Sequence, residues 1–250
     1  MLMKRLTSHA ARSFKIVTIN KVLIFSIILN ACHKSSHDDT PVEQQHGCRI
    51  AYFVTNDRDT SFISYNTNGT INKLRESNGA ITSYIYSNNI VTITRNERTG
   101  FAYMTVVTLN PFGLPQNVRM DYDLTGTHWS KSDYEYNGDE VSRVTGRFSF
   151  VNIIDVVDLT WNDGNLISSS NGIRTTHFEY DLTKPHQDGD YFSLLKLLSG
   201  IESVRPKNLV TAADGIRFNY EYSAEGRISS ITEIAPNMDP VKHSFVYECF

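Results

Sequence analysis

Two short acidic groups come closest, by residue type and spacing, to a catalytic or metal-binding arrangement. Asp155 and Asp158 flank two valines, and Asp188 and Asp190 flank Gly189. Glycosidases use two carboxylates on either side of the bond that they cleave, and calcium sites collect about six to eight oxygen ligands. Carboxylates in turns, however, are far more often capping or solvated groups. We therefore expect no catalytic residue and no metal site in either group.

The histidines and the common catalytic motifs give no stronger signal. His128, His177, His186 and His243 are scattered along the chain without the spacing of metal ligands. The sequence contains no HExxH, GxSxG or P-loop motif, and no GxGxxG motif before a helix. We therefore expect a protein that is not an enzyme and that uses no cofactor.

Tryptophan and tyrosine side chains can also hold a ligand, because their rings stack on sugars. Most of the aromatic residues recur at regular intervals, which indicates core positions and cross-strand pairs. Trp129 lies outside that spacing. It is the candidate for an exposed ligand contact, and burial in the core is the alternative.

The charge of the chain is unevenly distributed. Five of its 24 basic residues and none of its 27 acidic residues fall within residues 1–31, so the remainder has a net charge of −8. Binding to nucleic acid needs a basic face that contacts phosphates. We therefore expect no nucleic-acid partner.

The basic N-terminal region leads into a short apolar run, Val22 to Leu29. This run is too short to span a bilayer, which needs about 20 apolar residues, and it predicts a secretory signal peptide over residues 1–31. The residues Leu29-Asn30-Ala31-Cys32 resemble the bacterial lipobox, from which Asn30 departs. The resemblance implies that Cys32 is acylated and anchors the mature chain in a membrane. An ordinary signal peptide with an incidental cysteine is the alternative.

Residues 32–47 are almost entirely polar and predict a flexible tether. Asp38 and Asp39 resemble the acidic export signals of surface lipoproteins in Bacteroidota. This resemblance implies an outer-membrane or cell-surface location, and a tether that faces the periplasm is the alternative.

Two cysteines remain if Cys32 is acylated. Cys48 opens the region after the tether, and Cys249 is one residue from its end. Exported domains fold where disulfides persist. We predict a Cys48–Cys249 disulfide that ties the two ends together, with two free buried thiols as the alternative.

Turn signals divide residues 48–250 into hairpins. Asn68-Gly69, Asn137-Gly138 and Asp163-Gly164 lie between alternating segments rich in aromatic and β-branched residues, as type I′ hairpins require. The pattern predicts one all-β domain, an antiparallel meander that forms a large curved sheet or a barrel-like body. Two stacked sheets remain the alternative.

A series of anchor residues marks the repeat. Its intervals run from 19 to 27 residues, except for one of 42 residues that indicates an insertion. Inside the insertion, the run from Tyr191 to Leu198 ends at Gly200 and predicts a short helix near 190–199 that plugs one end or one face of the sheet. The anchors are Tyr65, Tyr86, Leu109, Tyr136, Trp161, Tyr180, Tyr222 and Tyr247.

The hairpin at residues 220–231, with its Gly226-Arg227 turn, resembles the YD-type repeats of Rhs proteins. Most other hairpins of the chain lack the arginine after glycine. Residues 48–249 as a whole resemble Bacteroidota lipoproteins of unknown function that are described as porin-like β domains. The shared features are the early cysteine, the repeated hairpins, the helical insertion after Tyr180 and the segment Lys207-Asn208-Leu209. The resemblance implies a fold and a location but no activity.

Together these features predict a membrane-anchored lipoprotein of the cell envelope. We expect a binding or scaffold module whose partner is a glycan or an envelope protein. One alternative is a polysaccharide hydrolase with carboxylates paired by folding. The other is a purely structural envelope component.

Overall fold

A computed structural model describes residues 47–201 and 204–250. The predicted signal peptide, Cys32 and all but the last residue of the predicted tether lie outside the described residues.

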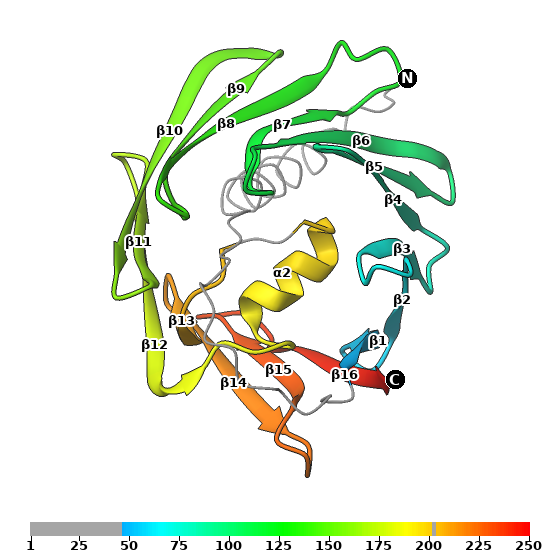
Figure 1. The fold of residues 1–250 in the computed structure, drawn as a ribbon, viewed down its shortest axis with the longest axis vertical. Coiled ribbons are helices and arrows are strands. Elements are labelled where there is room, and N and C mark those ends of the chain that lie inside the picture. The colour runs from blue at the N-terminus through cyan, green and yellow to red at the C-terminus, as the bar shows by residue number, and fades with distance from the viewer. Residues whose placement is uncertain (1–46, 202–203) are drawn as a thin grey trace, which may run out of the picture.

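The described chain forms a closed antiparallel barrel in which each strand pairs with its neighbours in sequence (Figure 1). The all-β meander is confirmed, and of the arrangements left open it is the closed barrel. The strands are β1 (Cys48–Thr55), β2 (Asp59–Tyr65), β3 (Ile71–Glu76), β4 (Ile81–Ser87), β5 (Ile90–Glu97), β6 (Gly100–Leu109), β7 (Pro115–Asp121), β8 (Trp129–Asn137), β9 (Glu140–Phe148), β10 (Val151–Asn162), β11 (Asn165–Ser170), β12 (Thr175–Pro185), β13 (Asn208–Ala213), β14 (Ile216–Tyr222), β15 (Ile228–Ile234) and β16 (Val241–Cys249).

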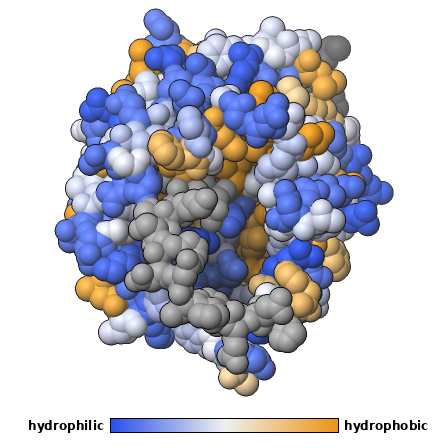
Figure 2. Space-filling view, in the orientation of Figure 1, coloured by the Kyte–Doolittle hydropathy of each residue, from blue (hydrophilic) through white to orange (hydrophobic). Residues whose placement is uncertain are grey.

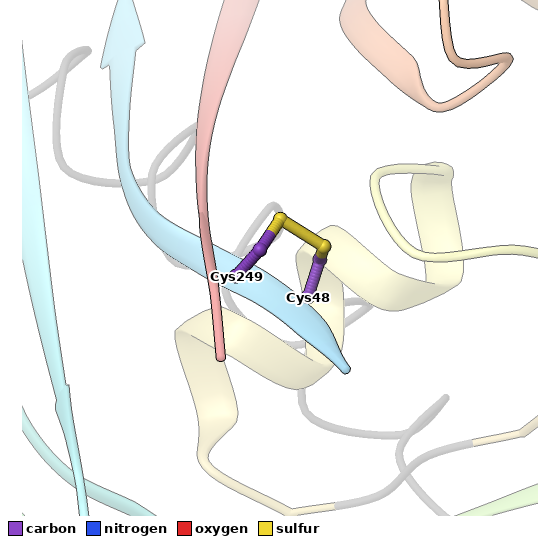
Figure 3. Close-up of a disulfide and its surroundings, with 2 residues drawn as sticks. All are labelled: Cys48 and Cys249. Carbon is purple, nitrogen blue, oxygen red and sulfur yellow. A yellow bond between two sulfur atoms is a disulfide. The ribbon is translucent and has the colours of Figure 1, made fainter. Parts of the chain in front are cut away.

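The first and last strands close the barrel. β1 and β16 pair in a register that sets Cys48 opposite Cys249 and Phe53 opposite Phe245. The two cysteines are joined by a disulfide with an S–S distance of 2.04 Å (Figure 3). Both the backbone ladder and the covalent bond therefore hold the seam of the barrel.

The alternation of side chains along each strand separates an apolar interior from a polar exterior. In β4, Tyr84 is buried while the adjacent Ile85 is 63% exposed. Val107, Val144 and Leu166, on three other strands, are fully buried. The core therefore lies inside the barrel.

A closed barrel of this many strands is too wide for its own side chains to fill, and comparable barrels leave a channel or hold a plug. Here the interior holds α2 (Tyr191–Ser199), seen inside the ring of strands in Figure 1. Phe192, Leu194, Leu195 and Leu197 of this helix are buried in the core. The predicted short helix is confirmed. No helix within the described chain has the length and apolar character of a membrane span.

Most of the anchor residues share a hydrogen bond that accounts for their spacing. In five even-numbered strands, a tyrosine hydroxyl donates to a backbone carbonyl of the preceding strand, and in β10 the indole N–H of Trp161 donates to Val141 in the same way at 2.8 Å. A buried phenol needs such a partner. The bond recurs in six of the eight even-numbered strands, whereas on β4 Tyr86 donates to the Gly200 carbonyl and on β6 the anchor is Leu109. The tyrosine pairs, at 2.6–2.8 Å, are Tyr65 to Ile50, Tyr136 to Pro115, Tyr180 to Leu166, Tyr220 to Val210 and Tyr247 to Ile228.

One anchor assignment is wrong by two residues. Tyr220, not Tyr222, makes the hydrogen bond on β14, and Tyr222 is 37% exposed. A β-bulge between Glu221 and Tyr222 shifts the register at this point. Because the same residue type stands at positions 220 and 222, the sequence does not indicate which of the two tyrosines makes the bond.

Candidate functional site

The strands alternate in direction, so their turns gather on two rims of the barrel. We use "disulfide rim" for the end that carries Cys48, Cys249, the described residues 186–201 and 204–207 of the insertion, and the turns after β2, β4, β6, β8, β10 and β14. Several hollows of the described chain open beside this insertion. They make the disulfide rim the candidate binding face.

One of these hollows, about 710 Å³ in volume, lies between the insertion and the turns that follow β8 and β10. We call it the tryptophan hollow, because Trp161 is its one aromatic lining residue. Its wall combines three carboxylates with two basic side chains and an imidazole. The lining residues are Asp139, Glu140, Trp161, Gly164, His186, Gln187, Asp188, Arg205, Pro206 and Lys207.

Two further hollows adjoin the insertion on its other sides. The seam hollow, of about 630 Å³, lies beside the closing strands and is lined by Gly47, Cys48, Gln187, Asp188, Glu225, Arg227 and Tyr247. The tyrosine hollow, of about 460 Å³, lies between α2 and the first six strands. Tyr65 and Tyr86 are its aromatic lining residues, and Asp188 borders it as well.

The geometry around Gly189 fixes the position of Asp188. Gly189 has a φ of +92°, and a Cβ atom there would lie 2.8 Å from the Tyr247 hydroxyl and 3.1 Å from Ile228 Cβ. The Tyr247 hydroxyl also contacts the Asp188 carbonyl oxygen at 3.1 Å. The close approach that only glycine permits therefore holds Asp188 against the closing strands, between the hollows.

The second carboxylate of this acidic group has a different role. Asp190 is fully buried and caps α2, accepting a hydrogen bond from the Ser193 backbone N–H at 2.9 Å. Its other oxygen pairs with Nδ1 of His186. Asp188 and Asp190 therefore do not act as a facing pair, since one lines the hollows and the other anchors the helix.

The base of the insertion is tied to the turn between β10 and β11. Asn165 and Asn208 form a buried reciprocal pair, in which the Asn165 amide donates to Asn208 and the Asn208 backbone N–H donates back, both at 3.0 Å. The Lys207 backbone N–H donates to the Gly164 carbonyl at 2.9 Å, and the Lys207 ammonium pairs with Asp163 at 2.8 Å. These bonds fix one wall of the tryptophan hollow.

Burial changes the acid–base behaviour of several lining residues. The pKa of Glu140 is raised by burial and by the neighbouring charge of Asp139. Burial raises the pKa of Tyr86 to about 12, and it also raises the pKa values of Tyr65 and Tyr247. The tyrosines therefore stay neutral near pH 7 and present uncharged rings.

The two tryptophans lie at opposite rims of the barrel. Trp129 lies on the outer wall at the opposite rim, half-buried, with the Arg119 guanidinium 5.1 Å from its ring centre. Trp161, assigned to the core by its spacing, packs against the core and also lines the tryptophan hollow. The sequence feature that indicates a rim position for Trp161 is its place directly before the Asn162-Asp163-Gly164 turn, because a strand reaches the rim where its turn begins.

The other acidic group is divided between two faces of the barrel. Asp155 and Asp158 lie three residues apart on β10, so their side chains point to opposite sides. Asp158 pairs with Arg143 at 2.6 Å on the outer wall. Among the described residues, no group of three or more His, Cys, Asp or Glu side chains has an arrangement that could hold a metal ion.

The outer wall carries ion pairs within and between strands. Asp133 pairs with Arg147 at 2.8 Å and with Lys131 at 3.2 Å, and Glu221 pairs with Lys242 at 2.8 Å. Figure 2, which looks into one end of the barrel as Figure 1 does, shows that hydrophilic side chains also cover most of that face, with hydrophobic ones scattered among them. The outer wall is therefore rich in charge.

The end of the hairpin formed by β9 and β10 is the main apolar exception on this surface. Phe150, Val151, Ile153 and Ile154 are between 39% and 62% exposed there. This apolar hairpin end lies at the opposite rim, away from the three hollows.

Comparison with known proteins supports the fold. No protein-family model and no curated protein matches this sequence. A crystal structure of a porin-like protein from Bacteroides vulgatus ATCC 8482 is similar, with a TM-score of 0.55 and 12% identity over 80% of this chain and 98% of that one. A porin-like protein from Bacteroides uniformis ATCC 8492 gives a TM-score of 0.53, with the same identity and coverage. At this identity the likeness shows the fold alone, which agrees with the porin-like resemblance and leaves the YD-type resemblance untested.

Proposed function

We propose that this protein is a lipid-anchored component of the bacterial cell envelope that binds carbohydrate in the tryptophan hollow. The observation that carries the proposal is the combination of Trp161 with polar and charged groups in one hollow. Sugar rings present apolar faces that stack on an aromatic ring, and hydroxyl groups that bond to carboxylates, amides and basic side chains. Glu140, Gln187 and Arg205 offer these three kinds of group.

The envelope location rests on three supports. The lipobox-like residues ending at Cys32 and the apolar run before them imply export and acylation. The Cys48–Cys249 disulfide suits an oxidising compartment. The similar folds belong to porin-like proteins of Bacteroides species.

Two features favour binding at the rim over passage through the barrel. The interior contains α2 with its buried leucines, where a pore needs an open polar channel. A barrel that spans a membrane presents an apolar band outward, whereas ion pairs such as Arg143–Asp158 lie on the outer wall here. These features support our proposal that the domain lies beside the membrane and is held there by its tether.

We propose binding without catalysis. Asp139 and Glu140 are consecutive where the chain turns from β8 into β9, and we assign them, together with Asp188, to hydrogen bonds with sugar hydroxyl groups. The alternative functions are a glycan hydrolase and a protein-binding scaffold, and the following experiment distinguishes them from carbohydrate binding.

Affinity electrophoresis of the mature chain through gels that contain plant, microbial and host polysaccharides tests the proposal. We expect retardation without clearing of the gel, and we expect Trp161→Ala to abolish it. Trp129→Ala, on the outer wall, is the matched control and should migrate like the wild type. If the Trp161 variant fails to fold, Glu140→Gln still tests the same hollow, because it changes only one charge at the rim. We expect this variant to weaken retardation several-fold.

Each other outcome contradicts part of the proposal. Clearing of a gel would identify a hydrolase. Equal loss of retardation in the Trp129 and Trp161 variants would remove the tryptophan hollow as the site. No retardation on any polymer would refute carbohydrate binding and favour a protein partner or a structural role.

A further inference from the structure

The tryptophan hollow and the seam hollow share a wall. Gln187 and Asp188 line both of them, and these consecutive residues lie between Trp161 on one side and Tyr247 on the other. The two volumes, about 710 and 630 Å³, each fall within the range of about 300 to 1,000 Å³ typical of small-molecule sites. Two adjoining hollows of this size suit a ligand built from several ring-sized units.

Given the proposed function, we infer that the ligand is an extended, neutral polysaccharide chain that crosses Gln187 and Asp188 from the tryptophan hollow into the seam hollow. Each hollow supplies one aromatic ring. The hydroxyl of Tyr247 is held by the carbonyl oxygens of Ile228 and Asp188 at 2.8 and 3.1 Å. Its contribution to a ligand is therefore its ring and not a free hydroxyl.

The shared wall is rigid, which a binding path for a polymer requires, because preorganised groups lose less entropy on binding. Gly189 is packed against Ile228 and Tyr247, and its backbone N–H lies 3.0 Å from the Ser193 hydroxyl. The next residue, Asp190, caps α2. Asp188 is thus held from both sides at the junction of the two hollows.

The charges along this path favour a neutral chain over an anionic one. Asp188 borders both hollows, with Asp139 and Glu140 on one side of it and Glu225 on the other. The basic residues on the path are Arg205, Lys207 and Arg227, together with His186. Lys207 is already paired with Asp163, at 2.8 Å. A polyanion would meet carboxylates in both hollows with no excess of cations to offset them.

The test compares chain length and charge in one titration series on the full-length protein, purified in detergent. The probes are gluco- and manno-oligosaccharides of two to eight units, with oligogalacturonates of matched length as the anionic series. We expect affinity for a neutral series to rise about tenfold or more between the shortest and longest probes. We expect the anionic series to bind at least about tenfold more weakly.

Matched carboxylate-to-amide variants test which part of the polysaccharide chain each hollow binds. Glu140→Gln, in the tryptophan hollow, should weaken short and long probes alike, whereas Glu225→Gln, in the seam hollow, should weaken long probes several-fold and leave short ones unchanged. Glu135→Gln is the control, because Glu135 is exposed on the outer wall of β8.

The outcomes separate this inference from the proposed function. Binding that does not grow with chain length, or that ignores Glu225→Gln, would overturn the extended path and leave the single carbohydrate site intact. Tighter binding of the anionic series would overturn the neutral ligand. An absence of binding by every probe would overturn both the path and the proposed function.

Discussion

The hydroxyl of Tyr86 donates to the carbonyl oxygen of Gly200 at 2.9 Å, across a separation of 114 residues. Tyr86 lies on β4 and Gly200 ends α2, so this bond ties the helix inside the barrel to the wall that surrounds it. The neighbouring Tyr84 hydroxyl lies 3.4 Å from the Leu198 carbonyl. The last carbonyl groups of a helix have no partner within it, and here the wall supplies those partners.

Gly200→Ala should destabilise the barrel strongly, because it combines backbone strain with a steric clash. Gly200 has a φ of +70°, and a Cβ atom there would lie 1.9 Å from Tyr84 Cε1. The left-handed conformation costs about 1–2 kcal/mol for a residue with a Cβ, and overpacking adds about 1–3 kcal/mol. We expect the free energy of unfolding, measured in urea, to fall by about 2–5 kcal/mol.

Gly215→Ala provides the matched control for this prediction. Gly215 has a similar φ of +79°, but nothing lies within 4 Å of the position that its Cβ would occupy. Only the backbone cost of about 1–2 kcal/mol should appear there. Equal effects of the two substitutions would show that the contact between Gly200 and Tyr84 is not formed in solution.

The inward tyrosines predict a loss of stability at alkaline pH. Burial raises the pKa of Tyr86 to about 12 and raises the pKa of Tyr180 and Tyr220 as well. Below pH 10, tyrosine is protonated in both the folded and the unfolded chain, so its contribution to stability is constant. Above pH 10 the unfolded chain loses these protons first, and the free energy of unfolding should fall as pH rises towards 12.

Urea unfolding at pH 8, 10 and 11, followed together with tyrosinate absorbance, checks this expectation. Tyr220→Phe removes one buried phenol and should reduce the alkaline loss. Tyr222→Phe, on the same strand but exposed, should leave it unchanged. Stability that stays flat to pH 11, or buried tyrosines that ionise without unfolding, would contradict the hydrogen-bonded interior.

The Cys48–Cys249 disulfide should stabilise the barrel without being needed to form it. The bond closes a loop with a sequence separation of 201 residues, and native disulfides contribute about 2–5 kcal/mol. The backbone pairing of β1 with β16 continues from Arg49 to Thr55 and does not depend on the bond. Reduction should therefore lower Tm while the circular dichroism spectrum keeps its β character.

The Cys48→Ser, Cys249→Ser double variant separates this effect from other actions of the reductant. Its Tm should equal that of the reduced wild-type protein, and adding reductant should not change it further. A wild-type Tm that is insensitive to reductant would show that the two thiols are free in solution.

Much of this fold was readable from local signals. Asp163-Gly164 forms the predicted type I′ turn, with both residues at positive φ. At Asn137-Gly138 the hairpin forms but the predicted turn type is wrong, because the loop residues are Gly138 and Asp139 and of these only Gly138 has a positive φ. The position of α2 followed from the run that ends at Gly200. Its location inside the barrel was not readable, because closure depends on the number and tilt of the strands together and not on any one of them.

The candidate site was mostly hidden from the sequence for the same reason. Asp139, Trp161 and Lys207 meet at one hollow, yet they lie in a turn, near the end of a strand and in the insertion respectively, and no local pattern in the sequence indicates that they converge. Trp161 matched the spacing of core residues, and it does pack on the core. The sequence could not show that its strand ends at the hollowed rim, and so Trp129 was the better candidate by spacing alone.

Acylation of Cys32 predicts how the protein divides between membrane and soluble fractions. Stable anchoring needs more than one acyl chain or a second signal, and bacterial lipoproteins of the type that the lipobox implies carry several chains. Expressed in a bacterial host with an alkyne-labelled fatty acid, the wild-type chain should carry the label and sediment with membranes. Cys32→Ala should lose the label and shift to the soluble fraction. Cys48→Ala, sixteen positions along the sequence, is the control for the loss of a cysteine and should keep the label, because Cys48 lies in the barrel seam. A Cys32→Ala protein that stays labelled, or a wild-type chain that remains soluble, would contradict the lipid anchor and leave the barrel as an exported domain without one.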